Sequence, residues 1–194
     1  KGGLIYFKTS GSTAELKASS LKWGLADEVD EWDWTTPQGD PLVLFEIRFA
    51  AFHNSKLFIV SSPTIKDASK IEEQFEAGDQ RSCYLPCPHC DERQTLKWSN
   101  LRWTANAHRV TRAWYVCEHC GCEIEEYNKS AMLASHRWVA ANPGAMYRSY
   151  RINGLYTPIG LGRSWLQLAQ EWIEAQGDPR KLVVFVNTRL AETW

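Results

Sequence analysis

The sequence predicts an α/β fold that begins with part of a parallel sheet, continues with a β-rich module held by cysteines, and ends in helices. Three observations predict it. Strand and helix patterns alternate over residues 1–80, as in a βαβ crossover unit. All six cysteines fall between residues 83 and 122, and apolar residues at helical spacing return after residue 164. We therefore expect three parts, residues 1–80, 81–151 and 152–194.

Three segments of the first part have strand patterns. They are Leu4–Lys8, the alternating residues Leu21, Trp23 and Leu25, and the apolar run Leu57–Val60. A continuous apolar run is typical of a strand buried on both faces, as in parallel sheets. Because the chain starts with Lys1 and enters a strand pattern at once, we expect it to be a piece of a larger protein.

Three helices are predicted around these strands. A short one lies near Ala14–Ser19. Asp40 is a typical N-cap and is followed by proline, and a set of apolar residues then marks one helical face: Leu42, Phe45, Phe49 and Phe52. Asp67 is expected to cap another helix, which Gly78 ends.

Composition and charge indicate a globular chain whose parts differ in charge. Of 194 residues, 44% are hydrophobic and 23% are charged, and no run of about 18 apolar residues could span a membrane. The net charge is −1, so overall charge does not indicate nucleic-acid binding. Residues 1–80 hold 8 Lys/Arg against 13 Asp/Glu, whereas residues 81–151 hold 10 against 6. This asymmetry favours two units with different roles.

Polar residues follow two of the predicted strands, at the edge where parallel sheets collect their chemistry. Asp27-Glu28 after an apolar strand is the pattern of a Walker B motif, whose Asp holds Mg²⁺ and whose Glu polarises the attacking water. Ser61–Thr64 follows the next strand, with hydroxyls that could sense a phosphate. Two carboxylates in a solvated turn are the alternative, but the crossover unit and the second polar strand end favour the nucleotide site.

Four cysteines predict a zinc site of the ribbon type. Cys87/Cys90 and Cys117/Cys120 form two Cys-x-x-Cys pairs, and 26 residues separate the pairs. Four thiolates at about 2.3 Å complete a tetrahedral shell, so the metal would be structural. Between the pairs we expect a long hairpin over 95–103 and 112–116, and Gly121 can take a positive φ. A disulfide pairing is the weaker alternative, since nothing indicates secretion.

Other residues near the two pairs have less definite roles. His89 and His119 lie inside them and could replace a cysteine ligand, while Cys83 and Cys122 are expected to be bystanders. Arginines and tryptophans surround the pairs and could track a DNA backbone and stack on bases, or could form an ordinary solvated face over a small core. They are Arg81, Arg93, Arg102, Arg109, Arg112 and Arg137, with Trp98, Trp103, Trp114 and Trp138.

The last part is predicted to hold two helices. Ser164 is a plausible N-cap for a helix over residues 165–176, and Asp178-Pro179 opens another. Their apolar residues are expected to pack in a core rather than to bind a partner.

A series of short motifs along nearly the whole chain resembles one protein family in content and in order. The series comprises Gly2-Gly3, Asp27-Glu28-Val29-Asp30, Gly39-Asp40-Pro41, Arg48, Ser61–Thr64, Asp79-Gln80-Arg81, Cys87–Cys90 with Leu96-Lys97-Trp98, Cys117–Gly121, Asn153–Tyr156 and Phe185–Glu192. In these motifs the chain resembles the GpA family, the large terminase subunits of lambda-type tailed phages.

The resemblance implies a DNA-packaging motor that joins a RecA-like P-loop ATPase to a metal-dependent endonuclease. Asp27 would be the Walker B Mg²⁺ ligand and Glu28 the catalytic carboxylate. Ser61, Ser62 and Thr64 would belong to the motif that couples hydrolysis to movement. Arg48 would face a phosphate, or be an exposed helical arginine.

The resemblance also implies cofactors and partners. The parent protein would use ATP and Mg²⁺ besides structural zinc, and would act in the bacterial host's cytoplasm. Its partners would be double-stranded DNA, the terminase small subunit and the portal of the procapsid, with several copies forming the motor and no membrane involved.

Two departures from the family pattern limit this interpretation. The chain contains no Gly-x-x-x-x-Gly-Lys-Ser/Thr phosphate loop, and Ala191 stands where the family usually has glycine. We therefore expect the second half of the ATPase domain (1–80), a zinc-ribbon module (81–151) and a helical linker (152–194) towards a nuclease domain beyond Trp194, with little or no activity alone. The alternatives are a zinc-ribbon module that binds nucleic acid or protein without catalysis, and the remnant of another P-loop protein such as a helicase.

Overall fold

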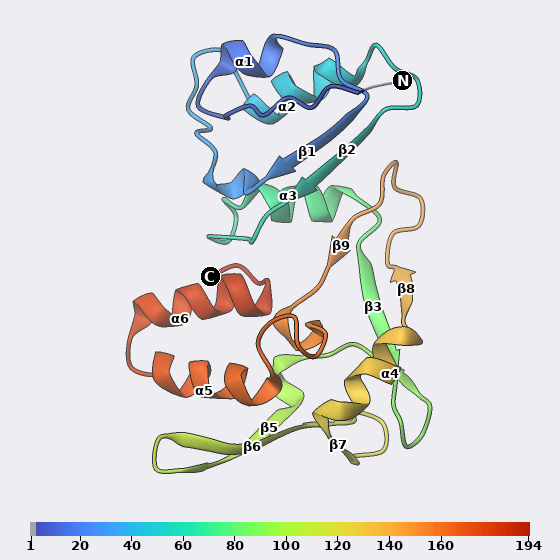
Figure 1. Cartoon of the computed structure of the whole chain (residues 1–194), viewed down its shortest axis with the longest axis vertical. Helices are drawn as coiled ribbons and strands as arrows, with labels where there is room; N and C mark the ends of the chain where they lie inside the picture. The colour runs from blue at the N-terminus through green and yellow to red at the C-terminus, as the bar shows by residue number, and fades with distance from the viewer. Residues whose placement is uncertain (1–2) are drawn as a thin grey trace. The chain divides into compact units, whose positions relative to one another are not determined.

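The computed structural model describes residues 3–194, which fold into two compact units with mixed α/β structure (Figure 1). The first unit ends at Ser62, and the second spans Pro63–Trp194. Gly2 of the motif series lies outside the described residues. None of the described helices is long and apolar enough to cross a membrane.

The first unit is built on the predicted parallel pair. Strand β1 (Trp23–Asp27) pairs with β2 (Lys56–Val60) in parallel, with Asp27 opposite Val60. Helix α1 (Thr13–Lys17) precedes the pair, and the turn η1 (Val29–Glu31), helix α2 (Pro41–Glu46) and the turn η2 (Ile47–Phe49) lie between its strands. Asp40 caps α2 as predicted, because its Oδ1 accepts hydrogen bonds from the amides of Leu42 (2.8 Å) and Val43 (3.2 Å).

Two expectations for this unit are wrong. Residues 4–8 form no strand, because nothing in the described chain pairs with them. Strand β2 is covered on one face only, since Phe49 of η2 packs on the face that carries Gly24, while Leu25 and Phe58 on the other face are 64% and 61% exposed. A Cβ on Gly24 would lie 2.2 Å from the Phe49 ring, which explains a glycine within an apolar strand.

The second unit begins with helix α3 (Lys70–Ala77), which corrects one predicted cap. Ser69 rather than Asp67 is its N-cap, because the Ser69 hydroxyl accepts a hydrogen bond from the Glu72 amide (3.2 Å). Asp67 instead takes a positive φ of 63° in the preceding turn. Gly78 ends the helix as predicted.

Two small sheets follow. Strand β3 (Arg81–Pro86) pairs antiparallel with β4 (Arg93–Gln94) and β8 (Arg137–Ala140), and in parallel with β9 (Tyr150–Arg151). The other sheet is antiparallel, in the order β5 (Leu101–Asn106), β6 (Arg109–Val116), β7 (Glu123–Ile124). The first hairpin strand starts later than predicted, because residues 98–100 form the turn η3. After β7 come η4 (Glu126–Asn128) and helix α4 (Lys129–Ala134).

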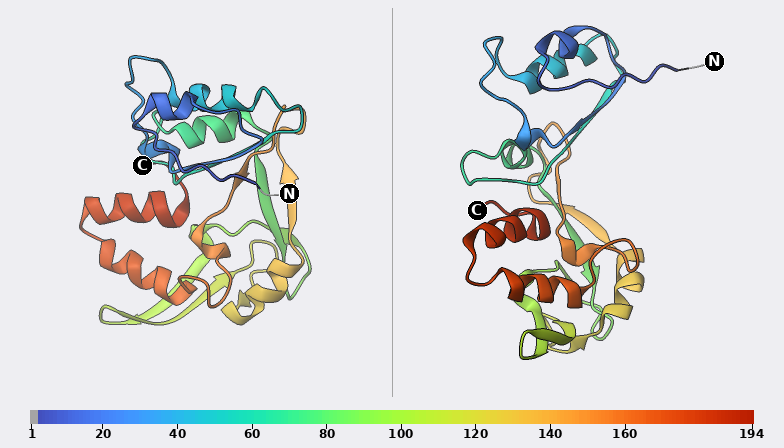
Figure 2. Two further views of the ribbon diagram at one scale, coloured as in Figure 1. Left: turned by 45° about the horizontal axis from the view of Figure 1, so that its top comes forward. Right: turned by 60° about the vertical axis from the view of Figure 1, so that its left-hand side comes forward.

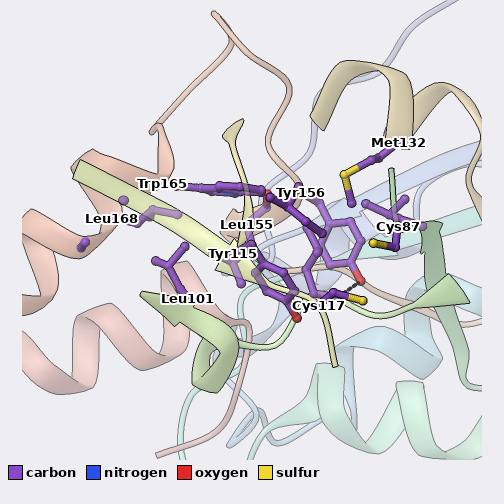
Figure 3. Close-up of a cluster of buried hydrophobic side chains, with 14 of the residues drawn as sticks. Cys87, Leu101, Tyr115, Cys117, Met132, Leu155, Tyr156, Trp165 and Leu168 are labelled. Atoms are coloured by element: carbon purple, nitrogen blue, oxygen red, sulfur yellow. Dashed lines mark hydrogen bonds between the residues drawn. The ribbon is translucent and has the colours of Figure 1, made fainter. Parts of the chain in front are cut away.

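Helix α5 packs on the second sheet, and α6 packs on α5 (Figure 2). After the turn η5 (Gly154–Tyr156), helix α5 (Trp165–Ala175) begins with a capping box between Ser164 and Gln167, and α6 (Pro179–Phe185) is capped by Asp178, both as predicted. A π-helical turn, η6 (Val186–Leu190), continues α6. Trp165 of α5 is fully buried, and its ring lies 5.9 Å from that of Tyr115 in β6 (Figure 3).

Ala191 ends η6 in the left-handed region, at φ 52°, a conformation that would suit the glycine that the resemblance implies at this position. A left-handed conformation costs a residue with a side chain about 1–2 kcal/mol. Glycine avoids this cost, and the greater conformational entropy that it gives the unfolded chain offsets only part of the gain. We expect Ala191→Gly to raise the free energy of unfolding by about 0.5–1 kcal/mol in denaturant titrations. Ala169→Gly, inside α5, is the control and should lower it by about 1 kcal/mol or more. Destabilisation by both changes would contradict the strain at Ala191.

Candidate functional site

The four cysteines of the two Cys-x-x-Cys pairs come together, and we call them the cysteine cluster. The Sγ atoms of Cys87 and Cys120 are 3.9 Å apart, as are those of Cys90 and Cys117, and all four lie within 4.8 Å of one another. Four sulfurs at about 2.3 Å from one tetrahedral ion would be about 3.8 Å apart. The donor set and its spacing therefore fit a tetrahedral thiolate-bound ion.

The backbone forms the same turn around each pair. The Cys87 carbonyl accepts a hydrogen bond from the Asp91 amide (2.9 Å), and the Cys117 carbonyl accepts one from the Gly121 amide (3.0 Å). Asp91 and Gly121 both take a positive φ, 60° and 70°, as predicted for the glycine. Within each turn, the amide two residues after the first cysteine points at its sulfur, at 3.4 Å in both cases.

The two histidines inside the turns hold the turns to each other. The Nε2 of His89 lies 2.9 Å from the Glu123 carbonyl, and the Nε2 of His119 lies 3.2 Å from the Arg93 carbonyl. Each ring therefore contacts the strand that leaves the opposite turn. This arrangement gives the histidines a positioning role and leaves the four sulfurs as the donor set.

The thiol pKa values of Cys87 and Cys120 are shifted in opposite directions, by burial in one case and by a hydrogen bond in the other. Cys87 and Cys117 are buried beside Tyr156 and Met132 (Figure 3), whereas Cys120 is exposed. Burial raises the pKa of the Cys87 thiol to about 12, while the Cys122 amide lowers the pKa of Cys120 to about 6. Cys83 and Cys122 lie outside the cluster. Because the pKa of Cys87 is raised, its thiol would release a proton when an ion binds.

The structure also brings the two polar strand ends together. Because Asp27 and Val60 are opposite each other at the ends of β1 and β2, Glu28 and Ser61 follow them at one edge of the sheet. The Asp30 amide donates a hydrogen bond to the Ser61 hydroxyl (3.2 Å), which ties the two ends. Asp27 and Glu28 are both exposed, and Glu28 takes a positive φ of 51°. Two solvent-facing carboxylates thus follow β1 at the edge where Ser61 follows β2, and carboxylate oxygens are ligands that Mg²⁺ favours.

Arg48 contacts the protein backbone. Its Nη1 donates a hydrogen bond to the Lys17 carbonyl (2.9 Å), and its own carbonyl accepts one from the Leu21 amide (2.9 Å). The buried Nε has no hydrogen-bond partner within residues 3–194. Arg48 therefore joins the end of α1 to the approach to β1, and a phosphate contact stays a prediction.

The basic residues around the cysteine cluster are partly neutralised. Arg112 forms ion pairs with Glu123 (2.6 Å) and Glu125, and its guanidinium stacks 4.4 Å from the ring centre of Trp114. Arg102 donates to the carbonyls of Ser99 and Leu101. Arg81 is also paired with a carboxylate, that of Asp79 (2.7 Å), so two of the six arginines expected to attract DNA are compensated within the protein. This weakens the DNA hypothesis for this face.

The motif Asn153–Tyr156, for which sequence reasoning found no chemistry, holds the second unit together. The buried Tyr156 hydroxyl accepts a hydrogen bond from the Leu96 amide and donates one to the Cys83 carbonyl, both at 2.7 Å. Asn153 donates to the Leu96 carbonyl (2.9 Å), and a Cβ on Gly154 would come within 3.0 Å of the Arg189 carbonyl. Only the motif resemblance signalled these residues in advance.

Family models match most of the chain. "Phage terminase large subunit gpA, ATPase domain" matches residues 1–138, and "Terminase large subunit gpA, endonuclease domain" matches residues 147–194. The second match includes residues 152–194, which we expected to form a linker.

Two curated relatives are similar over most of the chain. The "Terminase, large subunit" of Enterobacteria phage P21 is 30% identical over 183 residues, which cover 81% of this chain and 27% of the relative. That of Escherichia phage lambda is 26% identical over 193 residues, which cover 87% of this chain and 29% of the relative. The chain thus spans less than a third of either relative, and no solved structure matches it significantly. On the match over residues 1–138, the chain belongs to the gpA family of phage terminase large subunits.

Proposed function

We propose that this chain works within a terminase large subunit that moves double-stranded DNA into a phage procapsid by ATP hydrolysis and cuts concatemeric DNA. The observation that carries the proposal is the paired strand end, where Asp27 and Glu28 stand beside Ser61 on parallel strands. Family membership supports it. The small subunit, the portal and further copies of the large subunit are the partners we propose on the same ground.

The residues of the strand ends have distinct proposed roles. Asp27 would hold Mg²⁺ through water, and the ion would neutralise charge on the transferred phosphate. Glu28 would orient the attacking water and accept its proton, since its carboxylate faces solvent at the strand end. Ser61, Ser62 and Thr64 would respond to the phosphate and pass the change along the chain. The chain lacks a Gly-x-x-x-x-Gly-Lys-Ser/Thr loop, so we propose that it hydrolyses ATP poorly by itself.

The first prediction for this site concerns Glu28→Gln in the longer terminase subunit. We expect DNA-stimulated phosphate release to fall by about 10²-fold or more, because the amide cannot accept a proton. Circular dichroism should be unchanged, since Glu28 is exposed. Glu31→Gln, three residues along on the same turn, is the matched control and should keep its activity. A fully active Glu28→Gln protein would refute the assignment.

For the cysteine cluster we propose one structural Zn²⁺, held by Cys87, Cys90, Cys117 and Cys120. The near-tetrahedral spacing of the sulfurs supports this proposal. Four thiolates leave no position for water or substrate, so the ion would stabilise the fold of a ribbon-like module rather than react.

Metal analysis tests this proposal. We expect one Zn²⁺ per chain, and Cys87→Ser should lose the ion and the cooperative unfolding of residues 63–194. Cys122→Ser is the control and should keep both, because Cys122 lies outside the cluster.

Metal binding should also depend on pH. Zinc affinity should weaken as pH falls, because protons compete for the thiolates and the pKa of Cys87 is already raised to about 12. A metal-free chain that unfolds as cooperatively as the metal-loaded one would contradict a structural role.

A further inference from the structure

The segment that follows β2 is held by the C-terminal end of the chain. The Thr64 carbonyl accepts two hydrogen bonds, from the Asn187 side chain (2.7 Å) and from the Trp194 amide (3.0 Å). The Lys66 amide in turn donates to the Trp194 carbonyl (3.1 Å). Residue 194 thus bonds to residues 64 and 66 as in a parallel strand pair, although about 130 positions separate them in the sequence.

The Asn187 side chain joins both parts of this contact. Its Nδ2 carries two hydrogens, and both are used, one on Thr64 and the other on the Glu192 carbonyl (2.9 Å). The second bond fixes the turn at Ala191, which returns the chain towards Thr64. Asn187 lies in the π-helical turn η6, a rare conformation that is frequent at functional sites.

The segment that Asn187 holds is a stiff one. Pro63 is buried, its ring fixes its own φ, and it restricts Ser62 to extended conformations. At the start of this segment, the Ser61 hydroxyl is bonded to the Asp30 amide, two residues after Glu28. Residues 61–64 thus form a short covalent connector, anchored at one end next to the strand-end carboxylates and at the other end by Asn187.

We propose that Asn187 is a positioning residue that transmits changes at the strand-end site to the segment matched by the endonuclease model. The inference rests on the proposed function of Ser61–Thr64. A shift of this connector on nucleotide hydrolysis would move the Thr64 carbonyl, and Asn187 would carry the movement to residues 186–194. The Asn187 amide therefore links the ATP-dependent step to DNA cleavage.

The contact itself can be tested in this chain without any assumption about activity. We expect Asn187→Ala to speed hydrogen exchange at the Trp194 and Lys66 amides about tenfold, since it removes two hydrogen bonds. Amides of β3 and β6 should be unaffected. Thr188→Ala is the matched control, because the exposed Thr188 hydroxyl donates only to the Val184 carbonyl within its own helix. Unchanged exchange at Trp194 would overturn the inference.

The coupling is tested in the longer subunit. With Asn187→Ala, we expect the dependence of DNA cleavage on ATP to fall about fivefold or more, while the KM for ATP stays unchanged. If the alanine variant folds poorly, Asn187→Asp replaces it, because aspartate has the same side-chain shape as asparagine but cannot donate the two hydrogen bonds. We expect the same loss of ATP dependence in this variant. Fast exchange with normal ATP dependence would overturn the coupling. The proposed function has a separate test, because it would be refuted by a Glu28→Gln variant that keeps its ATPase activity. The two failures can therefore be distinguished.

Discussion

The joining of the two cysteine turns is the constraint on which most of the second unit depends. It brings residues 87–90 and 117–120 together, and the histidine–carbonyl contacts at His89 and His119 repeat that link outside the sulfurs. Once these turns are joined, β6 presents Tyr115 to Trp165 of α5, and one core extends from the cysteines to the C-terminal helices. A ribbon alone would be too small to bury such a core, whereas ribbon and helices together can.

This shared core means that the two family matches do not correspond to two structural units. The matches meet between residues 138 and 147, inside the compact unit 63–194. Asp79, buried in front of β3, accepts a hydrogen bond from the Ser149 amide, and Arg151 pairs with Glu72 of α3 at 3.0 Å. The start of the endonuclease match is therefore fixed to residues of the ATPase match, which is the physical requirement for one to influence the other.

Sequence patterns correctly predicted several features that depend only on residues close in the sequence. Asp40, Ser164 and Asp178 cap helices where expected, because a cap needs only its own next turn. The cysteine spacing likewise identified a cluster that the fold assembles. Two failures depend on distant partners: within residues 3–194, no strand pairs with residues 4–8, and nothing covers the second face of β2. A third failure is local, because Ser69 caps α3 in place of Asp67, two residues earlier. The hydrogen bond from Arg48 to the backbone and the two hydrogen bonds from the Asn187 amide produce no periodic pattern in the sequence. Sequence analysis could therefore not reveal either contact.

The backbone conformation of Glu28 is a further feature of the strand-end site. A left-handed conformation costs a residue with a side chain about 1–2 kcal/mol, so the fold must compensate it there. Compensation is available, because the Trp32 indole donates to the Asp27 carbonyl (2.9 Å) and Ser61 binds the Asp30 amide. Glycine would take this conformation without cost, yet the chain has a carboxylate here. Asp67, Gln80, Asp91, Ala107 and Ala191 also take a positive φ, so the strain at Glu28 is compatible with its proposed role but does not single it out.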